Sequence, residues 1–292
     1  NTTDSKLKGA VVASVGGWST GANINTARKS LEGTGTSNTA AIAFGGTANP
    51  PVYALTEQYN GSAWTETADM NVGRTSTGAA GTSTAAIAFG GGDPSQSQVD
   101  ETELWNGTSW SETADLNTAR DNMGPTMAGT TTAALGAGGS PPTVAITEQW
   151  NGTSWTEVGD LNTARYSLAG AGTVTSGLVW GGAFPQKAQT ESWNGSAWTV
   201  TADLNIARYN FAGSGVSNTS ALAFGGQPGL GGSANETELW NGTSWSEQNN
   251  LSTAKVGFGS SGTTTSALSF AGEGPPTLTA TEAWNVPFTT IR

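Results

Sequence analysis

The chain has 292 residues, 42 of them glycine, and 22 acidic against 11 basic side chains give it a formal net charge of −11 at pH 7. Glycine at about twice its ordinary share favours turns and short strands over long helices and predicts an all-β protein, while the acidic balance argues against nucleic acid as a partner. Cysteine and histidine do not occur, which excludes disulfides, thiol nucleophiles, histidine bases and the zinc, copper or haem sites built on those ligands.

The sequence gives little information about where the protein is located. No run of 18 or more apolar residues occurs, so we expect no membrane insertion. The opening residues, 1–6, lack the apolar core of a signal peptide. Because the chain begins with Asn1 and not with Met, processing or incomplete coverage of the N-terminus stays open.

An internal repeat runs through the chain. Each unit holds a basic residue in Asn-Thr-Ala-Arg or a close variant, at spacings of 46, 46, 45, 43 and 47, with a Trp ten residues before it. The basic residues are Arg28, Arg74, Arg120, Arg165, Arg208 and Lys255, and the tryptophans are Trp18, Trp64, Trp110, Trp155, Trp198 and Trp245. We expect one domain, 1-292, of six units at approximately 24-69, 70-115, 116-160, 161-203, 204-250, and 251-292 plus 1-23.

The residue pattern of each unit predicts four short strands, which follow one another in chain order. A strand rich in glycine and alanine follows the basic residue, as in 166–170, and a small, apolar strand ending in a glycine pair comes next, as in 220–226. The third strand carries Thr-Glu-x-Trp, as in 237–240. Asn241-Gly242 then suits the left-handed backbone of a tight hairpin turn, and Trp245 lies on the fourth strand.

Four antiparallel strands repeated six times at about 46 residues predict a six-bladed β-propeller. The basic residue before the inner strand, the Gly-Gly after the second, the aromatic on the third and the Trp on the fourth resemble the kelch repeat family over all six units. The resemblance implies a kelch-type β-propeller with four antiparallel strands per blade. It implies little about function, because such propellers include enzymes, scaffolds and receptors.

The ring needs a strand to close it, since an open ring leaves strand edges exposed. We predict that the N-terminal strand around residues 15–20 completes the blade containing 253–285. Residues 287–292 could instead fill that place, which would leave the N-terminus as an extra edge strand or a tail.

Two further residue types recur once per unit. The fourth-strand tryptophans are expected to pack blade against blade and not to form a ligand platform. A glutamate in each Thr-Glu-x-Trp is expected to form an ion pair with the basic residue, within or between blades. No unit has a distinct carboxylate pair, so we expect no catalytic residue, metal site or cofactor. The glutamates are Glu57, Glu103, Glu148, Glu191, Glu238 and Glu282.

Two local patterns have a plain structural interpretation. The Asn-Gly-Ser/Thr sequons could accept glycans, but hairpin geometry already explains their placement. Four residues after the basic residue, five units have Gly or Ala, which suggests crowding near the axis. The first unit has Glu32 at this position, and we expect its carboxylate to be solvated in a central channel. The sequons begin at Asn60, Asn106, Asn151, Asn194 and Asn241.

The segments between the glycine pair and Thr-Glu differ most between units. They hold nine of the eleven prolines. In a four-stranded blade they lie on the same face as the connections from the fourth strand to the next blade, and the residue after each repeat Arg or Lys lies on that face too. Proline lowers the cost of ordering a loop on binding, so we predict that this variable rim binds a partner; drift in unconstrained loops is the alternative. The candidate ligand-binding residues are Tyr53, Asp93, Gln96, Phe184, Lys187, Tyr166 and Tyr209.

The repeated sequence blocks indicate one class of function. Near-identical Trp-Asn-Gly-Thr-Ser-Trp and Ala-Asp-Leu-Asn-Thr-Ala-Arg blocks resemble the kelch-like repeat proteins of marine bacteriophages, such as tail fibres and adhesins. This resemblance implies a non-enzymatic virion structural or adhesion module, on the virion surface or extracellular, whose partners are other virion proteins and a host-surface glycan or protein. Fibre proteins are commonly symmetric oligomers, so a homo-oligomer stays open.

Two alternatives remain. One is a bacterial secreted or cell-surface lectin-like propeller. The other is a kelch-containing enzyme, against which the residue content argues. Copper oxidases of that group use His and Cys ligands that this chain lacks, and neither the Ser-x-Asp-x-Gly-x-x-Trp boxes nor the arginine cluster of sialidase-type propellers is found.

Overall fold

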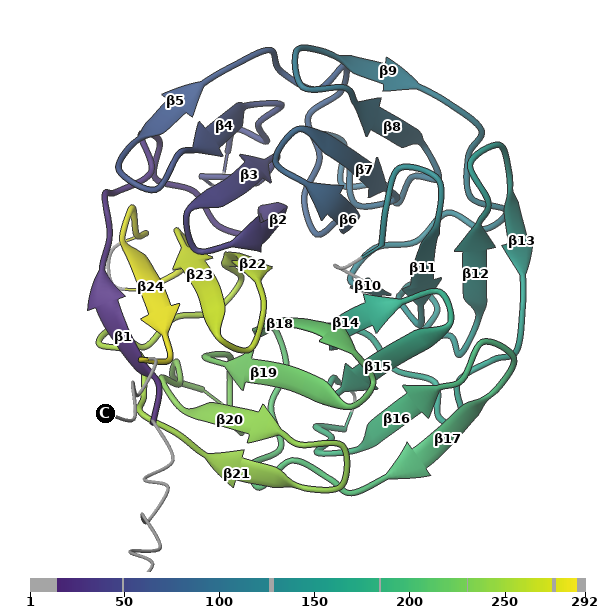
Figure 1. Cartoon of the computed structure of the whole chain (residues 1–292). Helices are drawn as coiled ribbons and strands as arrows, with labels where there is room; N and C mark the ends of the chain where they lie inside the picture. Colours follow the sequence, from purple (N-terminus) through teal and green to yellow (C-terminus); the bar gives the residue numbers. More distant parts are fainter. Residues whose placement is uncertain are drawn as a thin grey trace, which may run out of the picture.

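The fold is a ring of six antiparallel sheets. The computed structural model describes residues 15–48, 50–125, 129–183, 185–229, 231–274 and 277–287. Within these ranges the chain forms 24 strands and no helix, so none of its described part could cross a membrane as a helix. The six four-stranded sheets stand around one axis as the blades of a β-propeller, which confirms the predicted fold class (Figure 1).

Within a blade the strands follow chain order from the axis outward (Figure 1). The innermost strands contact those of the neighbouring blades, and their small side chains allow this convergence. Blades 1 to 3 consist of β2 (Glu32–Ser37), β3 (Ala40–Phe44), β4 (Thr56–Tyr59) and β5 (Trp64–Glu66); β6 (Gly78–Thr82), β7 (Ala85–Phe89), β8 (Thr102–Trp105) and β9 (Trp110–Glu112); and β10 (Gly124–Pro125), β11 (Ala134–Ala137), β12 (Thr147–Trp150) and β13 (Trp155–Glu157).

The same order repeats in the next two blades and in most of the last. Blades 4 and 5 consist of β14 (Ala169–Thr173), β15 (Ser176–Trp180), β16 (Thr190–Trp193) and β17 (Trp198–Thr201); and β18 (Ala212–Ser217), β19 (Ser220–Phe224), β20 (Thr237–Trp240) and β21 (Trp245–Glu247). Blade 6 takes β22 (Gly259–Gly262), β23 (Ser266–Phe270) and β24 (Thr281–Asn285) from the end of the chain and β1 (Gly17–Thr20) from its beginning.

The N-terminal strand closes the ring, as predicted. β1 pairs antiparallel with β24, with Trp18 opposite Trp284 and Gly17 opposite Asn285. This supplies the perimeter strand that the sixth unit lacks. The alternative closing segment, 287–292, falls outside the described residues from position 288 onward.

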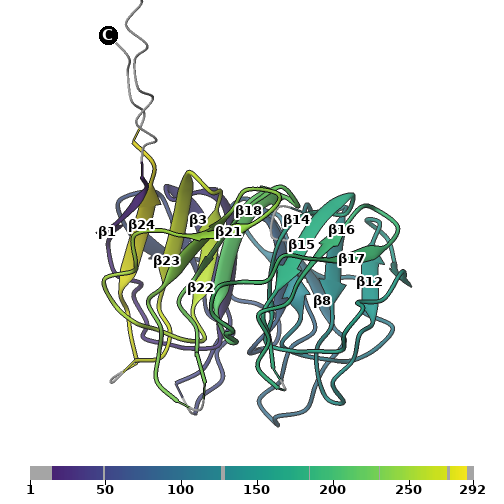
Figure 2. The ribbon, with the colours of Figure 1, turned by 90° about the horizontal axis from the view of Figure 1, so that it is seen from below.

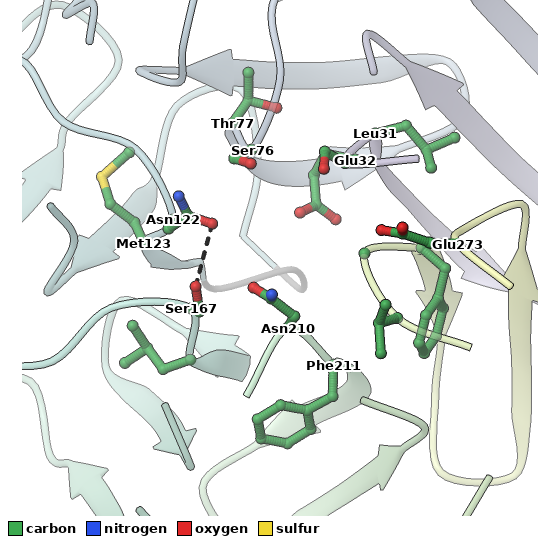
Figure 3. Close-up of a pocket in the computed structure, with 15 residues that line it drawn as sticks. Leu31, Glu32, Ser76, Thr77, Asn122, Met123, Ser167, Asn210, Phe211 and Glu273 are labelled. Atoms are coloured by element: carbon green, nitrogen blue, oxygen red, sulfur yellow. Dashed lines mark hydrogen bonds between the residues drawn. The ribbon is translucent and has the colours of Figure 1, made fainter. Parts of the chain in front are cut away.

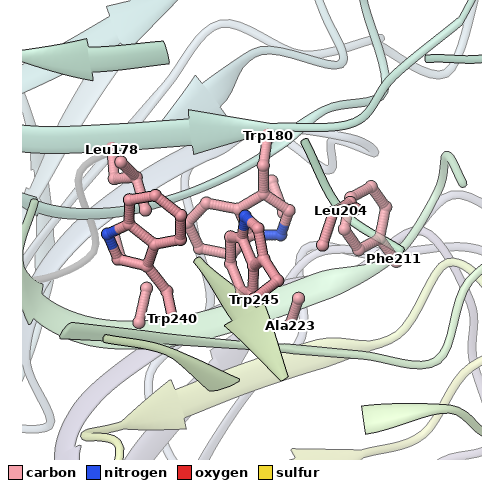
Figure 4. Close-up of a cluster of buried hydrophobic side chains, with 10 residues drawn as sticks. Leu178, Trp180, Leu204, Phe211, Ala223, Trp240 and Trp245 are labelled. Carbon is pink, nitrogen blue, oxygen red and sulfur yellow. The ribbon is translucent and has the colours of Figure 1, made fainter. Parts of the chain in front are cut away.

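The perimeter tryptophans join each blade to the one before it. In every blade the indole N–H of the fourth-strand Trp donates to the hydroxyl of the Thr that opens the third strand of the preceding blade, at 3.0 or 3.1 Å. The ring of Trp245, for example, packs on Trp180 of blade 4 with centroids 5.3 Å apart (Figure 4). The sequence repeat therefore corresponds to a contact that occurs six times around the ring.

The two faces of the ring carry different connections (Figure 2). One face, the hairpin face, holds the turns between first and second and between third and fourth strands. The variable rim, on the opposite face, holds the second-to-third loops and the blade-to-blade connections, which hydrogen-bond to one another: Met70 N–H donates to Ala54 O and Arg74 N–H to Tyr53 O. The segments that differ in sequence thus share one face.

The Asn-Gly turns differ from the expected tight turn. In β8–β9 the loop has four residues, 106–109, closed by Asn106 N–H donating to Ser109 O, and only Gly107 takes positive φ, +97°. The Asn106 Oδ1 accepts hydrogen bonds from the Thr108 N–H, the Thr108 hydroxyl and the Ser109 N–H. The Ser or Thr of each sequon therefore helps to cap its own turn, a structural reason for the pattern beyond the glycine.

Candidate functional site

The recurring charged residues meet in buried ion pairs within each blade. The carboxylate also accepts a backbone N–H from the connection that precedes the basic residue, as Glu103 does from Asn71 at 2.8 Å. Both partners are almost fully buried, so the pairs hold the connection against the third strand and leave no surface for a ligand. The pairs are Arg28–Glu57 (2.6 Å), Arg74–Glu103 (2.8 Å), Arg120–Glu148, Arg165–Glu191 (3.0 Å), Arg208–Glu238 (2.7 Å) and Lys255–Glu282 (3.6 Å).

Blade 6 has the weakest of these pairs. Lys255 stands where the other blades have Arg, and its ammonium lies 3.6 Å from Glu282. Burial lowers the pKa of Lys255 to about 8, and Glu282 opposes this. The blade assembled from both chain ends therefore also has the least well matched charge pair.

A closed ring of backbone hydrogen bonds surrounds the axis on the rim side. The residue two positions after each basic one donates its N–H to the equivalent carbonyl of a neighbouring blade, at 2.6 to 3.1 Å, until the circle closes. All six have left-handed φ, between +51° and +56°. We call this ring the axial collar, and it consists of Ser30, Ser76, Asn122, Ser167, Asn210 and Gly257.

The axial collar was not predicted from the sequence. Asn and Gly tolerate left-handed backbone better than other residues, and three of the six members are Asn or Gly. The three serines carry no such signal, because their conformation is imposed by the neighbours on either side. The sequence therefore indicates the axial collar only in the three units that have Asn or Gly two residues after the basic residue.

Inside the axial collar lies a cavity of about 190 Å³, the axial pocket. Its wall combines the polar collar with apolar side chains that stand directly before the inner strands, among them Met123, Phe211 and Phe258. Glu32 of β2 and Glu273 of blade 6 direct their carboxylates toward the same space (Figure 3). Glu273 is paired with Lys29 at 2.7 Å.

Glu32 faces the axis as expected and is half-buried, so it is less solvated than the sequence predicts. Burial raises the pKa of Glu32 to about 8, and the hydrogen bond from the Gly33 N–H only partly offsets this. The glycines at two equivalent positions have a different cause from the expected axial crowding. A β-carbon at Gly78 would lie 2.2 Å from the Phe89 ring, and one at Gly259 would lie 2.2 Å from the Phe270 ring, each in the next strand of its own blade.

The variable rim carries a second hollow, the rim groove, of about 820 Å³ between the loops of blades 1 and 2. Two of the candidate residues, Asp93 and Gln96, line it. Asp93 Oδ1 accepts hydrogen bonds from the N–H and hydroxyl of Ser95 and from the N–H of Ser97, which lower the pKa of Asp93. Asp121 of blade 3 also lines the groove.

The other candidate residues do not line the rim groove. Tyr166 and Tyr209 lie near each other on blades 4 and 5, where burial, then Tyr209 and then Asp121, raise the pKa of Tyr166. Tyr53 and Lys187 are half-buried in the loops of blades 1 and 4, where their backbones bond to the blade-to-blade connections. Phe184 lies outside the described residues. The structure therefore divides the predicted set into a groove pair and a tyrosine pair.

The described ranges contain no cluster of three or more acidic side chains placed to hold a metal ion. What the fold and the two hollows define is a six-bladed β-propeller with a uniform hairpin face, a varied rim and a polar axial pocket. No protein-family model matches the chain, and no curated protein matches it either.

Proposed function

We propose that this β-propeller is a non-enzymatic, virion-associated structural and adhesion module that displays its variable rim to a host-surface glycan or protein. The observation that carries the proposal is the contrast between the faces. The hairpin face repeats one capped turn from blade to blade, whereas the rim loops differ in length and sequence, and those of blades 1 and 2 enclose the rim groove. Variation concentrated around one hollow is what a recognition surface on a rigid scaffold requires.

The chemistry of the rim groove favours a hydroxyl-rich, uncharged or basic ligand. Asp93, Asp121, Gln96 and Gln98 supply carboxylate and amide groups that can accept and donate hydrogen bonds to sugar hydroxyls or to a polar peptide. Two carboxylates in a chain of net charge −11 repel an anionic glycan. Prolines at one edge of the groove restrict its loop, which reduces the entropy lost on binding.

The first and last strands meet at the hairpin face. Gly17 and Asn285 face each other at the hairpin face, where the amide of Asn38 in a hairpin turn donates to the Trp284 carbonyl and to Asn285 Oδ1. The sequence blocks that resemble phage repeat proteins support the virion part of the proposal, with other virion proteins as expected partners on the hairpin side.

Binding by the rim groove is tested with a glycan array and a host-cell adsorption assay. We expect the double variant Gln96→Ala, Gln98→Ala to lose at least ten-fold in binding, because it removes two groove amides without touching the framework. Gln248→Ala on the perimeter of blade 5 is the matched control. Equal binding by the groove variant and the control would contradict the proposal.

The virion assignment has its own test. Mass spectrometry of purified virions should detect the chain as a stoichiometric component. If the chain is absent from virions while the groove variant still loses glycan binding, the virion part is wrong and a secreted or cell-surface bacterial lectin-like propeller replaces it.

A further inference from the structure

Glu32 distinguishes blade 1 from the other five blades at the axis. It occupies the innermost strand position at which the others have Gly or Ala, so the described axial wall has a carboxylate on one side only at this level. Its backbone pairs with Phe44 of β3, so the repeat geometry is kept. Blade packing therefore does not require a glutamate here, and a small residue satisfies the same position elsewhere in the ring.

The carboxylate has no cationic partner among the described residues. Glu32 Oε1 accepts a hydrogen bond from the N–H of Gly33 at 3.1 Å, and none of the ion pairs of the described chain includes Glu32. The other carboxylate that lines the axial pocket, that of Glu273, is bound to the Lys29 ammonium at 2.7 Å. Glu32 is half-buried, and an acid that is partly withdrawn from water without a counter-ion is a costly feature for a fold to keep.

The rest of the axial pocket suits a small cation with several N–H donors. Figure 3 shows Asn210 of the axial collar directed toward the space that Glu32 faces, with Ser76 beside it, while the Ser167 hydroxyl donates to Asn122 Oδ1 at 3.3 Å. Their hydroxyl and amide oxygens can accept hydrogen bonds from an ammonium group. A cavity of about 190 Å³ has room for a group of a few heavy atoms.

We propose that the axial pocket binds a small primary ammonium group, with the Glu32 carboxylate as its counter-ion and the axial collar side chains as its hydrogen-bond acceptors. This site is separate from the rim groove and does not depend on the proposed rim function. A free small amine and an amine-bearing end of a larger molecule share the required chemistry.

Binding of the ammonium is coupled to release of a proton. Burial raises the pKa of Glu32 to about 8, so at neutral pH most molecules hold a protonated Glu32 that must ionise to pair with a cation. The affinity should therefore rise about ten-fold per pH unit between about pH 6 and 8 and level off above that. Glu273, which is paired with Lys29, is the other charged residue among the described lining of the axial pocket, while the lining next to β6 and β22 is neutral, with Thr77 and Ser260.

The test is a pH titration of the Glu32 carboxyl by ¹³C NMR in glutamate-labelled protein, with Glu32→Gln to assign the resonance. Ethanolamine hydrochloride is the probe; ethylene glycol is its neutral counterpart, and sodium chloride matches the ionic strength. We expect ethanolamine to lower the Glu32 midpoint, whereas glycol and salt leave it in place. Glu273→Gln should keep the response, because its carboxylate is already paired with Lys29.

Two results would overturn the proposal. One is a Glu32 midpoint that ethanolamine moves no further than sodium chloride does. The other is an equal shift with ethylene glycol, which would mean that charge plays no part. Should Glu32→Gln fail to fold, the wild-type protein still decides, because a carboxyl that titrates near pH 8 stands apart from the ordinary glutamate range of about 4.3.

Discussion

The contacts between blades and the lining of the axis and rim follow different rules. In the framework, the same three elements recur six times: a perimeter indole bonded to a threonine of the preceding blade, a buried charge pair within each blade and a collar peptide bonded to its neighbour. Around the axis and on the rim, equivalent positions hold unlike residues, such as Glu32 against Gly78, or Asp121 against Tyr166. Repetition is kept where each blade must fit the next, and variation occurs where the fit is already secured.

This comparison predicts that framework substitutions change stability and that rim substitutions change binding. The largest loss is expected for Trp155→Ala, which empties a site between blades 2 and 3 and removes the hydrogen bond to Thr102. The free energy of unfolding should fall by about 3–5 kcal/mol in denaturant titrations. Thr156→Ala, on the exposed neighbour, is the control and should stay near wild type. A small loss for Trp155→Ala would mean that the blades do not depend on their indoles.

Breaking one charge pair should have a nearly equal effect. Glu103→Gln leaves the buried Arg74 without a counter-ion, and removal of one partner of a buried pair costs about 3–5 kcal/mol. Glu112→Gln is the control: Glu112 lies opposite Glu103 in the β8–β9 register, and its substitution removes the same charge from an exposed position. Comparable unfolding midpoints for these two variants would contradict a structural role for the pair.

Removing only the interblade hydrogen bond should cost less. Thr102→Val keeps the shape of the side chain but leaves the Trp155 indole N–H unsatisfied, at about 1–3 kcal/mol. In a Trp155→Phe background the same substitution should have little effect, because no indole donor remains. A double-mutant cycle by thermal or chemical unfolding measures this coupling, and a zero coupling energy would count against the bond.

Glu32→Gln tests the axial position through pH. Because folding raises the pKa of Glu32 from 4.5 to about 8, the native state binds the extra proton between these values. The wild type should therefore lose stability relative to Glu32→Gln as pH rises from about 4.5 to 8, with a constant difference above that. Unfolding curves at several pH values check this. A difference that does not vary with pH would show that Glu32 is solvated.

The rim should tolerate change with the smallest effect on stability. Gln96→Ala is expected to alter the free energy of unfolding by no more than about 0.5 kcal/mol, since the side chain is exposed. A loss above about 1 kcal/mol would place Gln96 in the framework and weaken the division between the two regions.

The repeat in the sequence predicts the framework well, because each blade meets the same neighbours. The Trp spacing and the missing perimeter strand of the sixth unit suffice to predict six blades and closure by β1. The axial collar and the environment of Glu32 could not be predicted. Both depend on what six blades place around one axis: Ser76 acquires its left-handed φ from its neighbours, and Glu32 its raised pKa from burial.

The predicted site residues show the same limit. Asp93 and Gln96 lie in one loop, so their common position in the rim groove follows from proximity in sequence. The approach of Asp121 to that groove from blade 3 depends on how blades are arranged side by side. A repeat shows which loops share a face, but not which of them enclose a hollow.

Hydrogen exchange on binding tests the division most directly. With the best-bound glycan of the array, or with host-surface protein if no glycan binds, amide protection should increase in the rim loops at 47–52 and 92–98. The hairpin turns, such as 106–109, should exchange as in the free protein. Protection of the hairpin turns with unchanged rim loops would contradict the account.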